Sequence, residues 1–516
     1  MSAQELLMNK QGENAKQPSL AIALFAVATL LVVVMYGLIY RPHFTEHAAF
    51  PLEIVFLSAA VMLIAGLLVM GYDWQDILQA ITHKLARAIP TLLLLFAIGL
   101  LISSWMMSGT IPMLVYLGLS WINIDYLYVV AFVLPIIFSL CTGTSWGSIA
   151  TIGLVVMAVA TVVNAHLAIT AGAIVGGAYF GDKLSPLSDT TNIAAMAVGV
   201  DLYQHIGAML YTTLPSALLS FAIFYWLGGV YPADIAFSGN GVSTSLSTNS
   251  EALNVDILQY TLDAISQLFT LHWLLLAPPA IILFGAFFKK PPLPTLIVST
   301  VVACCLAFGI QSLALDDVIQ SLYQGFNVTM TRHVDVTVDE HVTVLFNRGG
   351  LYALHQPVVI TILVFIYVGA LDCVKAIPTI INRLLDNVQR PATLISSSLI
   401  ASAATNAMTS SQYANSFIVG ETFAKKYDQL GVPRKVLSRS LEDTGTMIES
   451  LVPWSTTAVF IYATLGISVA EYWQWQWLSL INIVLAFMFA WLGIGQFQNA
   501  RSKKESSRFI SAGKST

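Results

Sequence analysis

Apolar runs long enough to cross a bilayer recur along this chain, and they constrain its fold more than any other feature. The hydrocarbon core of a membrane is about 30 Å thick, which a helix of about 20 residues spans. Such runs occupy residues 19–39, 50–70, 90–108, 125–141, 202–228, 292–310, 354–373 and 473–494. Only 10% of the 516 residues are charged and 57% are hydrophobic, unlike a water-soluble domain. The chain is therefore predicted to be an integral membrane protein.

The spans are predicted to be helices. In hydrocarbon every backbone N–H and C=O group needs an internal partner, which leaves helices and closed barrels as spanning structures. A barrel would show segments of about ten residues with alternating polarity, and no such period occurs here. We expect an all-α polytopic membrane protein.

Basic residues gather at the ends of several runs and predict the topology. The clusters are Lys84 and Arg87; Lys289 and Lys290; Lys425, Lys426, Arg434, Lys435 and Arg439; and Arg501, Lys503, Lys504 and Arg508. The positive-inside rule places them, and both termini, in the cytoplasm. The expected parts are a cytoplasmic tail at 1–18, a first membrane repeat at 19–229, a polar linker at 230–270, a second membrane repeat at 271–495 with an extracytoplasmic loop at 311–350, and a cytoplasmic tail at 496–516.

The two halves have a similar layout, as expected for transporters built from repeats inserted in opposite directions. A shift of about 263 residues places the run at 90–108 on 354–373 and "TGTSWGSIATIG" (142–153) on "TNAMTSSQYANS" (405–416). Lys84 and Arg87 precede the first of these spans, whereas Lys375, Arg383 and Arg390 follow its counterpart. Both sets can be cytoplasmic only if the two copies are inverted. Broken helices and re-entrant hairpins are expected in such a fold.

Four polar breaks interrupt the apolar sequence: "GTSWGS", "GDKLSPLSDTTN", "TNAMTSSQYANS" and "EDTGTMIESLVPWS". Unwound backbone at membrane depth is tolerated where it lines a cavity and binds something. The candidate cation or proton ligands are Thr144, Ser145, Asp182, Ser185, Asp189, Thr190, Asn192, Asn406, Thr409, Ser410, Glu442, Asp443, Thr444 and Glu449. The candidate substrate or gating residues are Trp146, Lys183, Pro186, Pro453, Trp454 and Ser455.

The chemistry of these breaks favours a hard cation. Carboxylate, hydroxyl and carbonyl oxygens suit sodium, and neither a thiol nor an imidazole accompanies them. A charged carboxylate at a helix centre costs about 2.5–3.5 kcal/mol, which a bound cation or proton removes. Asp182 and Asp189 are expected to be buried together and to hold sodium and protons in competition, with Lys183 as a tethered counter-charge. Sodium is then a transported substrate, and no cofactor is expected.

Each candidate also has a structural interpretation. Asp182 and Asp189 could hold a broken helix together, with Asp189 as the N-cap of the helix that follows. Glu442, Asp443 and Glu449 could mark a cytoplasmic boundary, and Lys183 could reach an interface. Trp146 and Trp454 could be packing residues rather than substrate contacts.

The four segments "GTSWGSIATIG", "GGAYFGDKLSPLSDTTNIAA", "ATNAMTSSQYANSFIVGETF" and "SRSLEDTGTMIESLVPWSTTA" resemble, in order, the signature segments of the NhaC family of bacterial sodium/proton antiporters. The similarity runs over roughly residues 90–470. It implies an inverted-repeat fold, sodium/proton exchange, a homodimer and location in the bacterial inner membrane. Glu449 and Ser450 replace the serine-proline pair common in that family, and Ser455 replaces its usual asparagine.

This departure keeps a second function open, which is sodium-coupled transport of a small organic solute such as a carboxylate or an amino acid. An enzyme is not expected, because the chain has no HExxH or CxxC motif. A channel is disfavoured because paired breaks are typical of alternating access. Nothing in the sequence suggests a nucleic-acid partner.

Overall fold

The computed structural model describes residues 19–121, 124–233, 262–288, 290–331, 346–347, 349–385 and 388–497. This part of the chain is helical and contains no strand, so the all-α prediction is confirmed. The expected terminal tails, apart from residues 496–497, much of the 230–270 linker, and residues 332–345 and 348 of the expected extracytoplasmic loop lie outside it. Within the 311–350 segment the structure has a helix, α16 (Leu315–Gln324).

Eight helices in the described ranges are long and apolar enough to cross a membrane. They are Leu20–Tyr40, Leu52–Val69, Trp74–Met107, Ile124–Thr142, Ser145–Val162, Leu202–Val230, Pro292–Gly309 and His355–Cys373, with two further bent pairs at Leu262–Leu268 with Trp273–Gly285 and at Val469–Trp475 with Trp477–Leu492. All eight predicted runs fall on these elements. Ser145–Val162 and the first bent pair were not predicted as spans.

The helices form two compact units. The first unit contains α2 (Leu20–Val34), η1 (Met35–Tyr40), α3 (Arg41–Phe44), α4 (Leu52–Val69), α19 (Ala376–Leu385) and one end each of α5 (Trp74–Met107) and α18 (His355–Cys373). Tyr367 Oη donates to Ala26 O at 2.9 Å, and Lys84 Nζ to Asp372 Oδ2 at 2.5 Å. Lys84, expected at a cytoplasmic end, therefore lies within α5 and is 7% exposed.

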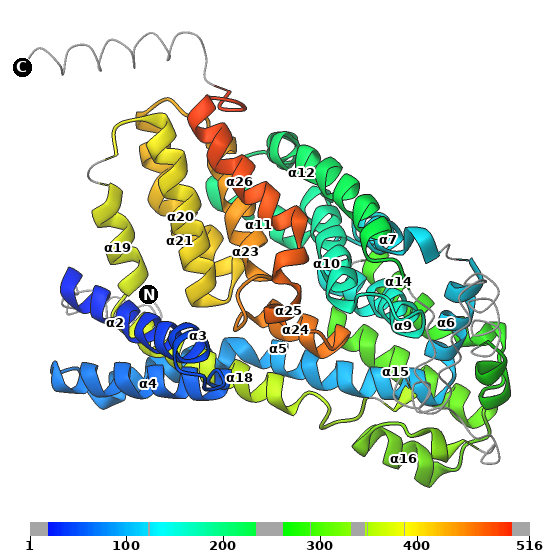
Figure 1. Cartoon of the computed structure of the whole chain (residues 1–516). Coiled ribbons are helices and arrows are strands. Elements are labelled where there is room, and N and C mark those ends of the chain that lie inside the picture. The colour runs from blue at the N-terminus through cyan, green and yellow to red at the C-terminus, as the bar shows by residue number, and fades with distance from the viewer. Residues whose placement is uncertain are drawn as a thin grey trace, which may run out of the picture. The chain divides into compact units, whose positions relative to one another are not determined.

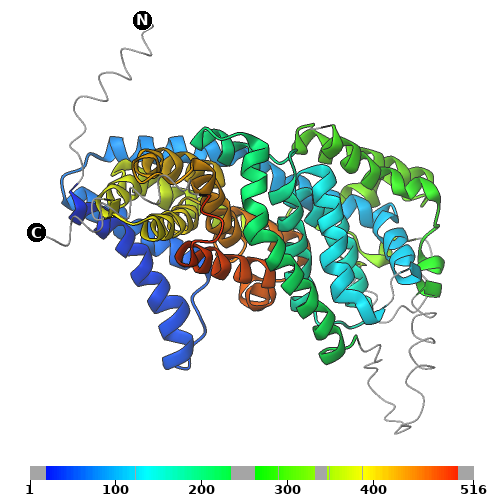
Figure 2. The same ribbon diagram turned by 90° about the horizontal axis from the view of Figure 1, so that it is seen from above.

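The second unit holds all four polar breaks. Its first part contains α6 (Thr110–Trp121), η2 (Ile124–Tyr126), α7 (Leu127–Thr142), α8 (Ser145–Ser148), η3 (Ile149–Gly153), α9 (Leu154–Val162), α10 (Leu167–Leu184), α11 (Asp189–Val198) and α12 (Leu202–Val230). Helices η4 (Trp273–Leu276), α14 (Ala277–Phe287), α15 (Pro292–Gly309), α16 and η5 (Val328–Met330) follow. Helix α12 lies beside α7, as Figures 1 and 2 show.

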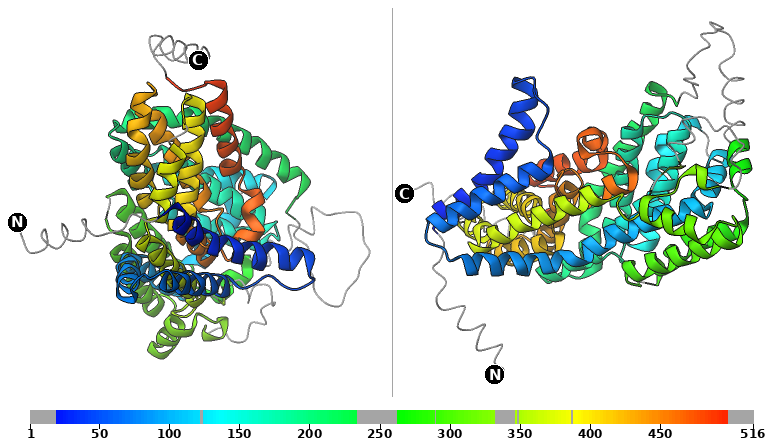
Figure 3. Two further views of the ribbon diagram at one scale, coloured as in Figure 1. Left: turned by 90° about the vertical axis from the view of Figure 1, so that its left-hand side faces the viewer. Right: turned by 90° about the horizontal axis from the view of Figure 1, so that it is seen from below.

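The remaining helices of the second unit resemble those from α7 to α11 in the order of their lengths and breaks. They are α20 (Pro391–Thr409), α21 (Gln412–Gln429), α22 (Arg434–Ser440), η6 (Leu441–Thr446), α23 (Met447–Glu449), α24 (Thr456–Leu465), α25 (Val469–Tyr472), η7 (Trp473–Trp475) and α26 (Trp477–Leu492). Helices α20 and α21 lie side by side, and α26 packs against α20 (Figures 1 and 3).

The backbone at the breaks recurs at a constant offset of 267 residues. Gly143 and Ser410 both adopt left-handed conformations, with φ of 70° and 51°. The next residue in each case, Thr144 or Ser411, has φ of −150° and caps a helix of 18 residues, Ser145–Val162 or Gln412–Gln429.

The second break in each half follows the same offset. Ser188 and Ser455 each cap a helix of ten residues, α11 or α24. These helices end at Gly199 and Gly466, which are both left-handed. The sequence offset of about 263 is thus four residues short, because it aligned similar letters instead of this backbone geometry.

Small residues allow α10 and α7 to pack closely. A Cβ atom at Gly177 would lie 2.1 Å from Phe132 O, and one at Gly181 would lie 2.6 Å from Ile136 O. Ser139 Oγ also donates to Ala178 O at 2.7 Å. Glycines four residues apart are typical of close helix contacts in membranes. This packing fixes the start of the Asp182 break, because Gly181 immediately precedes Asp182.

We predict that Gly177→Ala lowers the melting temperature of the purified protein in detergent by several degrees, because overpacking costs about 1–3 kcal/mol. The matched control is Gly207→Ala, since a Cβ atom at Gly207 in α12 would have no atom within 4 Å. The control should melt at or above the wild-type temperature. Equal effects of the two substitutions, measured by tryptophan fluorescence, would contradict the packing argument.

Candidate functional site

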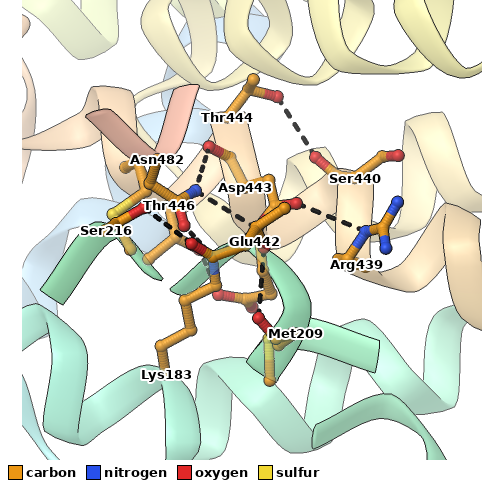
Figure 4. A network of polar contacts seen from close by, with 12 residues as sticks. Lys183, Met209, Ser216, Arg439, Ser440, Glu442, Asp443, Thr444, Thr446 and Asn482 are labelled. Atoms are coloured by element: carbon orange, nitrogen blue, oxygen red, sulfur yellow. Dashed lines mark hydrogen bonds and ion pairs between the residues drawn. The ribbon is translucent and has the colours of Figure 1, made fainter. Parts of the chain in front are cut away.

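A buried ion pair joins the two halves of the second unit. Lys183, in the last turn of α10, donates from Nζ to Asp443 Oδ1 at 2.5 Å, and both side chains are 0% exposed. The same oxygen accepts from Thr212 Oγ1 at 2.8 Å and from Asn482 Nδ2 at 3.2 Å. Figure 4 shows Asp443 at the centre of this network. Lys183 therefore partners Asp443, whereas the sequence offered it as a counter-charge near Asp182.

Asp443 has a second cationic partner in Arg439. The Nε atom of Arg439 lies 3.5 Å from Asp443 Oδ2, and its Nη1 donates to Gly495 O at 3.0 Å. Arg439 is only 1% exposed, although the sequence placed it in a cluster marking a cytoplasmic end. One carboxylate thus faces two buried cations, so the chain itself compensates the charge of Asp443.

Asp182 is buried without such compensation. Its Oδ2 accepts from the backbone N–H of Ser145 at 3.1 Å and from Ser145 Oγ at 2.7 Å. Ser145 is the first residue of α8, so the partial positive charge of a helix N-terminus also favours the carboxylate. Asp182 is 6% exposed, and its Oδ1 is buried without a hydrogen-bond partner. Neither lysine nor arginine forms an ion pair with it in the described chain.

The loop after Asp182 is held by its own hydroxyls and amide. Ser185 Oγ donates to Leu140 O at 2.9 Å, and Asn192 Nδ2 donates to Pro186 O at 3.0 Å. Thr190 Oγ1 lies 3.0 Å from Ser188 Oγ. These four polar side chains stabilise the broken backbone between α10 and α11.

Asp189 is exposed, so the expectation that it is buried beside Asp182 is wrong. It lies in the first turn of α11, where Oδ1 accepts from Thr190 N at 3.1 Å and Oδ2 accepts from the hydroxyl of Tyr413. The expectation that Asp189 caps this helix is also wrong, because the cap is Ser188. An acidic residue in the first turn still suits the dipole of α11.

Glu442 is the centre of a second buried polar cluster. It is 0% exposed, with Oε2 accepting from Thr446 Oγ1 at 2.6 Å and Oε1 accepting from Gln412 Nε2 at 3.4 Å. Gln412 Oε1 in turn accepts from Asn406 Nδ2 and Asn415 Nδ2, both at 3.0 Å. The Oδ1 atoms of both asparagines are buried without a hydrogen-bond partner. Glu442, like Asp182, forms no ion pair within the described residues.

The shape of this cluster depends on Gly445 in the π-helical turn η6. A Cβ atom there would lie 2.2 Å from Asn415 Nδ2 and 2.5 Å from Ser402 Oγ. Asn406 Nδ2 also donates to Gly445 O at 2.7 Å. Single π-helical turns are frequent at functional sites. The glycine thus lets the amides of α20 and α21 approach η6 directly.

The remaining candidate residues of the second half shape its breaks. Thr444 Oγ1 donates to Leu399 O at 2.7 Å, and Thr409 Oγ1 contacts Ser411 O at 3.4 Å. Ser410 is the buried left-handed residue of its break, and Ser455 caps α24 while its hydroxyl also donates to Glu449 O. Pro453 lies in the same break as Ser455.

Aromatic residues form matching contacts between the halves. Trp146 Nε1 donates to Thr457 Oγ1 at 3.2 Å, and its ring stacks on Phe460 at 4.3 Å between centroids. Tyr413 lies 267 residues after Trp146, and its hydroxyl donates to Asp189 at the start of α11. This contact runs from the second half to the first, whereas that of Trp146 runs from the first half to the second. Trp454 Nε1 donates to Ala407 O at 2.8 Å. Both tryptophans therefore have packing and hydrogen-bonding roles.

Sequence reasoning missed several residues of these networks: Thr212, Gln412, Tyr413, Arg439 and Asn482. Asn482 had a usable signal, because it is an amide inside an otherwise apolar run. Gln412 lies within a break that the sequence identified, but only the hydroxyl and asparagine side chains of that break were considered. No group of three or more His, Cys, Asp or Glu side chains that could hold a metal ion occurs in the described ranges.

Comparisons with known proteins place this geometry in context. A model of the Na+/H+ antiporter family matches residues 177–494, which include Asp182, Lys183, Glu442 and Asp443. The chain is 39% identical to an uncharacterized Na+/H+ antiporter of Haemophilus influenzae, over 87% of this chain and 92% of the relative. It is 31% identical to the Na+/H+ antiporter NhaC of Alkalihalophilus pseudofirmus, over 92% and 95%. It is also 28% identical to the malate-2H+/Na+-lactate antiporter of Bacillus subtilis, over 87% and 91%.

The ion-pair network yields a stability prediction. Asp443→Asn leaves Lys183 and Arg439 buried without a counter-charge, which should cost about 3–5 kcal/mol. Lys183→Met should cost less, because Arg439 remains to compensate Asp443 and arginine keeps its charge. Melting temperatures of the two purified variants in detergent test this order. A wild-type melting temperature for Asp443→Asn, or a larger loss for Lys183→Met, would contradict it.

Proposed function

Because the chain belongs to the Na+/H+ antiporter family, we propose that it exchanges sodium ions for protons through the buried carboxylates at its helix breaks. The family and the apolar helices make it a multi-pass membrane protein. The location proposed is the bacterial inner membrane, with both termini in the cytoplasm and two copies forming a homodimer. The two halves related by the 267-residue offset are proposed to be inverted repeats with re-entrant hairpins.

The contrast between compensated and uncompensated carboxylates is the observation that carries this proposal. Asp443 faces Lys183 and Arg439, whereas Asp182 and Glu442 are buried and form no ion pair in the described chain. A lone buried carboxylate is costly, so it takes up a proton or binds a cation. Since one group cannot hold both well, competition between sodium and a proton couples the two fluxes.

Asp182 supports a sodium site best. Its Oδ1 is free of hydrogen bonds, and the hydroxyls of Ser145 and Thr144 lie on the same break. Carboxylate and neutral oxygen ligands suit a hard cation. Sodium is cargo in this mechanism, and the transporter needs neither a cofactor nor an enzymatic step.

The second candidate is antiport of an organic anion with sodium or protons. The similarity to the malate-2H+/Na+-lactate antiporter favours it. Binding an organic carboxylate would call for a cationic group in the site. Lys183 and Arg439, the cations buried at these breaks, are both paired with Asp443, which supports sodium/proton exchange instead.

We predict that Asp182→Asn abolishes sodium-dependent proton flux, because asparagine cannot exchange a proton for a cation. Everted membrane vesicles with an acid interior and a pH-sensitive dye provide the measurement, with sodium added to dissipate the gradient. Asp201→Asn is the matched control, because Asp201 is exposed and caps α12, a role that asparagine fills equally well.

Flux in the Asp182→Asn vesicles equal to that of the control would refute the assigned site. If sodium alone has no effect on wild-type vesicles, but malate or lactate with sodium dissipates the gradient, the organic-anion function replaces sodium/proton exchange. Immunoblots of the vesicles establish that all variants are inserted in equal amount.

A further inference from the structure

Helix α26 continues into a short segment, residues 493–497, which we call the strap. Gly493 ends the helix in the left-handed conformation with φ of 73°, and Gly495 is also left-handed with φ of 63°. Gln496 Nε2 donates to Ala490 O at 2.7 Å and so satisfies a carbonyl in the last turn of α26. Two glycines and one side-chain cap therefore turn the strap back along the molecule.

The strap packs on α22 through two basic residues that lie one helical turn apart. Lys435 Nζ lies 3.8 Å from the centroid of the Phe497 ring, a cation–π contact, and the Tyr211 ring of α12 meets Phe497 edge-on at 5.0 Å. Four residues after Lys435, Arg439 Nη1 donates to Gly495 O at 3.0 Å. Because residues i and i+4 share a helix face, the strap covers the face of α22 that carries Arg439.

The buried guanidinium of Arg439 depends on this contact. Its Nε lies 3.5 Å from Asp443 Oδ2, and that oxygen is buried without a hydrogen-bond partner in the described ranges (Figure 4). The guanidinium is instead hydrogen-bonded to Gly495 O. A Cβ atom at Gly495 would lie 2.7 Å from Arg439 Nη1, so the absence of a side chain lets the strap approach.

The two cations of Asp443 are thus held in different ways. Lys183 reaches Oδ1 from α10 at 2.5 Å, whereas Arg439 precedes Asp443 by one turn and is fixed by the strap. A buried carboxylate that loses its counter-charges is strongly destabilising. The contribution of the strap should therefore depend on whether Lys183 is present, because both groups compensate the same carboxylate.

We propose that the strap positions Arg439 against Asp443, so that its docking secures the junction of α10, α22 and η6 during transport. The role in transport rests on the proposed sodium/proton exchange, whereas the effect on stability does not. The carboxylate of Asp182 is bound by Ser145 and lies outside this network. Loss of the strap contact should therefore lower the maximal rate of exchange and leave the half-saturating sodium concentration unchanged.

Gly495→Ala tests the contact, because its Cβ atom would displace Arg439 Nη1. Gly493→Ala is the matched control, since Gly493 is also left-handed but a Cβ atom there would have no atom within 4 Å. Both are made in the wild type and in Lys183→Met, and melting temperatures of the purified proteins are measured in detergent. With Lys183→Met, Gly495→Ala should lower the melting temperature by about 3 °C more than the sum of the single losses. Gly493→Ala should be additive.

Phe497→Ala is a second variant of the strap, which removes its cation–π anchor without straining the backbone. It should show the same excess loss with Lys183→Met as Gly495→Ala does. In proteoliposomes containing the full chain, both variants should lower the maximal sodium-dependent proton flux about threefold relative to Gly493→Ala, at an unchanged half-saturating sodium concentration.

Additive losses of melting temperature in both strap variants would overturn the positioning of Arg439. A changed half-saturating sodium concentration, or a maximal rate equal to that of the control, would overturn the role of the strap in transport. A wild type without sodium-dependent flux overturns the exchange function and that role together. In that case the melting temperatures still decide whether the strap positions Arg439.

Discussion

Charge compensation in a medium of low dielectric is the constraint on which this structure depends. Asp443 carries one negative charge and faces the two positive charges of Lys183 and Arg439. These ion pairs fix α10, η6 and α22 to one another. Asp182 and Glu442 receive only hydrogen bonds from neutral groups. Two kinds of carboxylate thus coexist within one bundle. One kind is paired with the protein's own cations, and the other is the kind at which we propose exchange of a sodium ion for a proton.

The positions of these carboxylates follow from helix termini. Asp182 meets the N-terminus of α8 because Gly143 turns the chain through the left-handed region and Thr144 then caps the new helix. Ser410 and Ser411 repeat this geometry in the other half. Ser410 makes the turn without the conformational freedom of glycine, which has a cost that the buried contacts around Thr456 and Asn406 must offset.

The sequence predicted the spans and the breaks well, because both depend on composition over many residues. Apolar runs and clusters of hydroxyl, glycine and proline residues are visible without knowledge of the partners. The contact partners of the individual side chains were harder to predict. Arg439 was read with its exposed neighbours as a boundary marker, since charge clusters do not reveal which member turns inward. Asp189 was expected to be buried because it follows Asp182 closely, although the turn at Pro186 separates their environments. The repeat register was four residues short because Gly143 and Ser410 share a conformation and not a residue type.

The reciprocal contacts of Trp146 and Tyr413 have a mechanical consequence. Each aromatic side chain follows the capped end of its own long helix by two residues and holds the first turn of the ten-residue helix from the opposite half. A shift of α11 would pull on α21, and a shift of α24 would pull on α8. Each break is therefore linked, through its aromatic side chain, to the ten-residue helix of the opposite half. Movement of one break would therefore disturb these contacts with its counterpart.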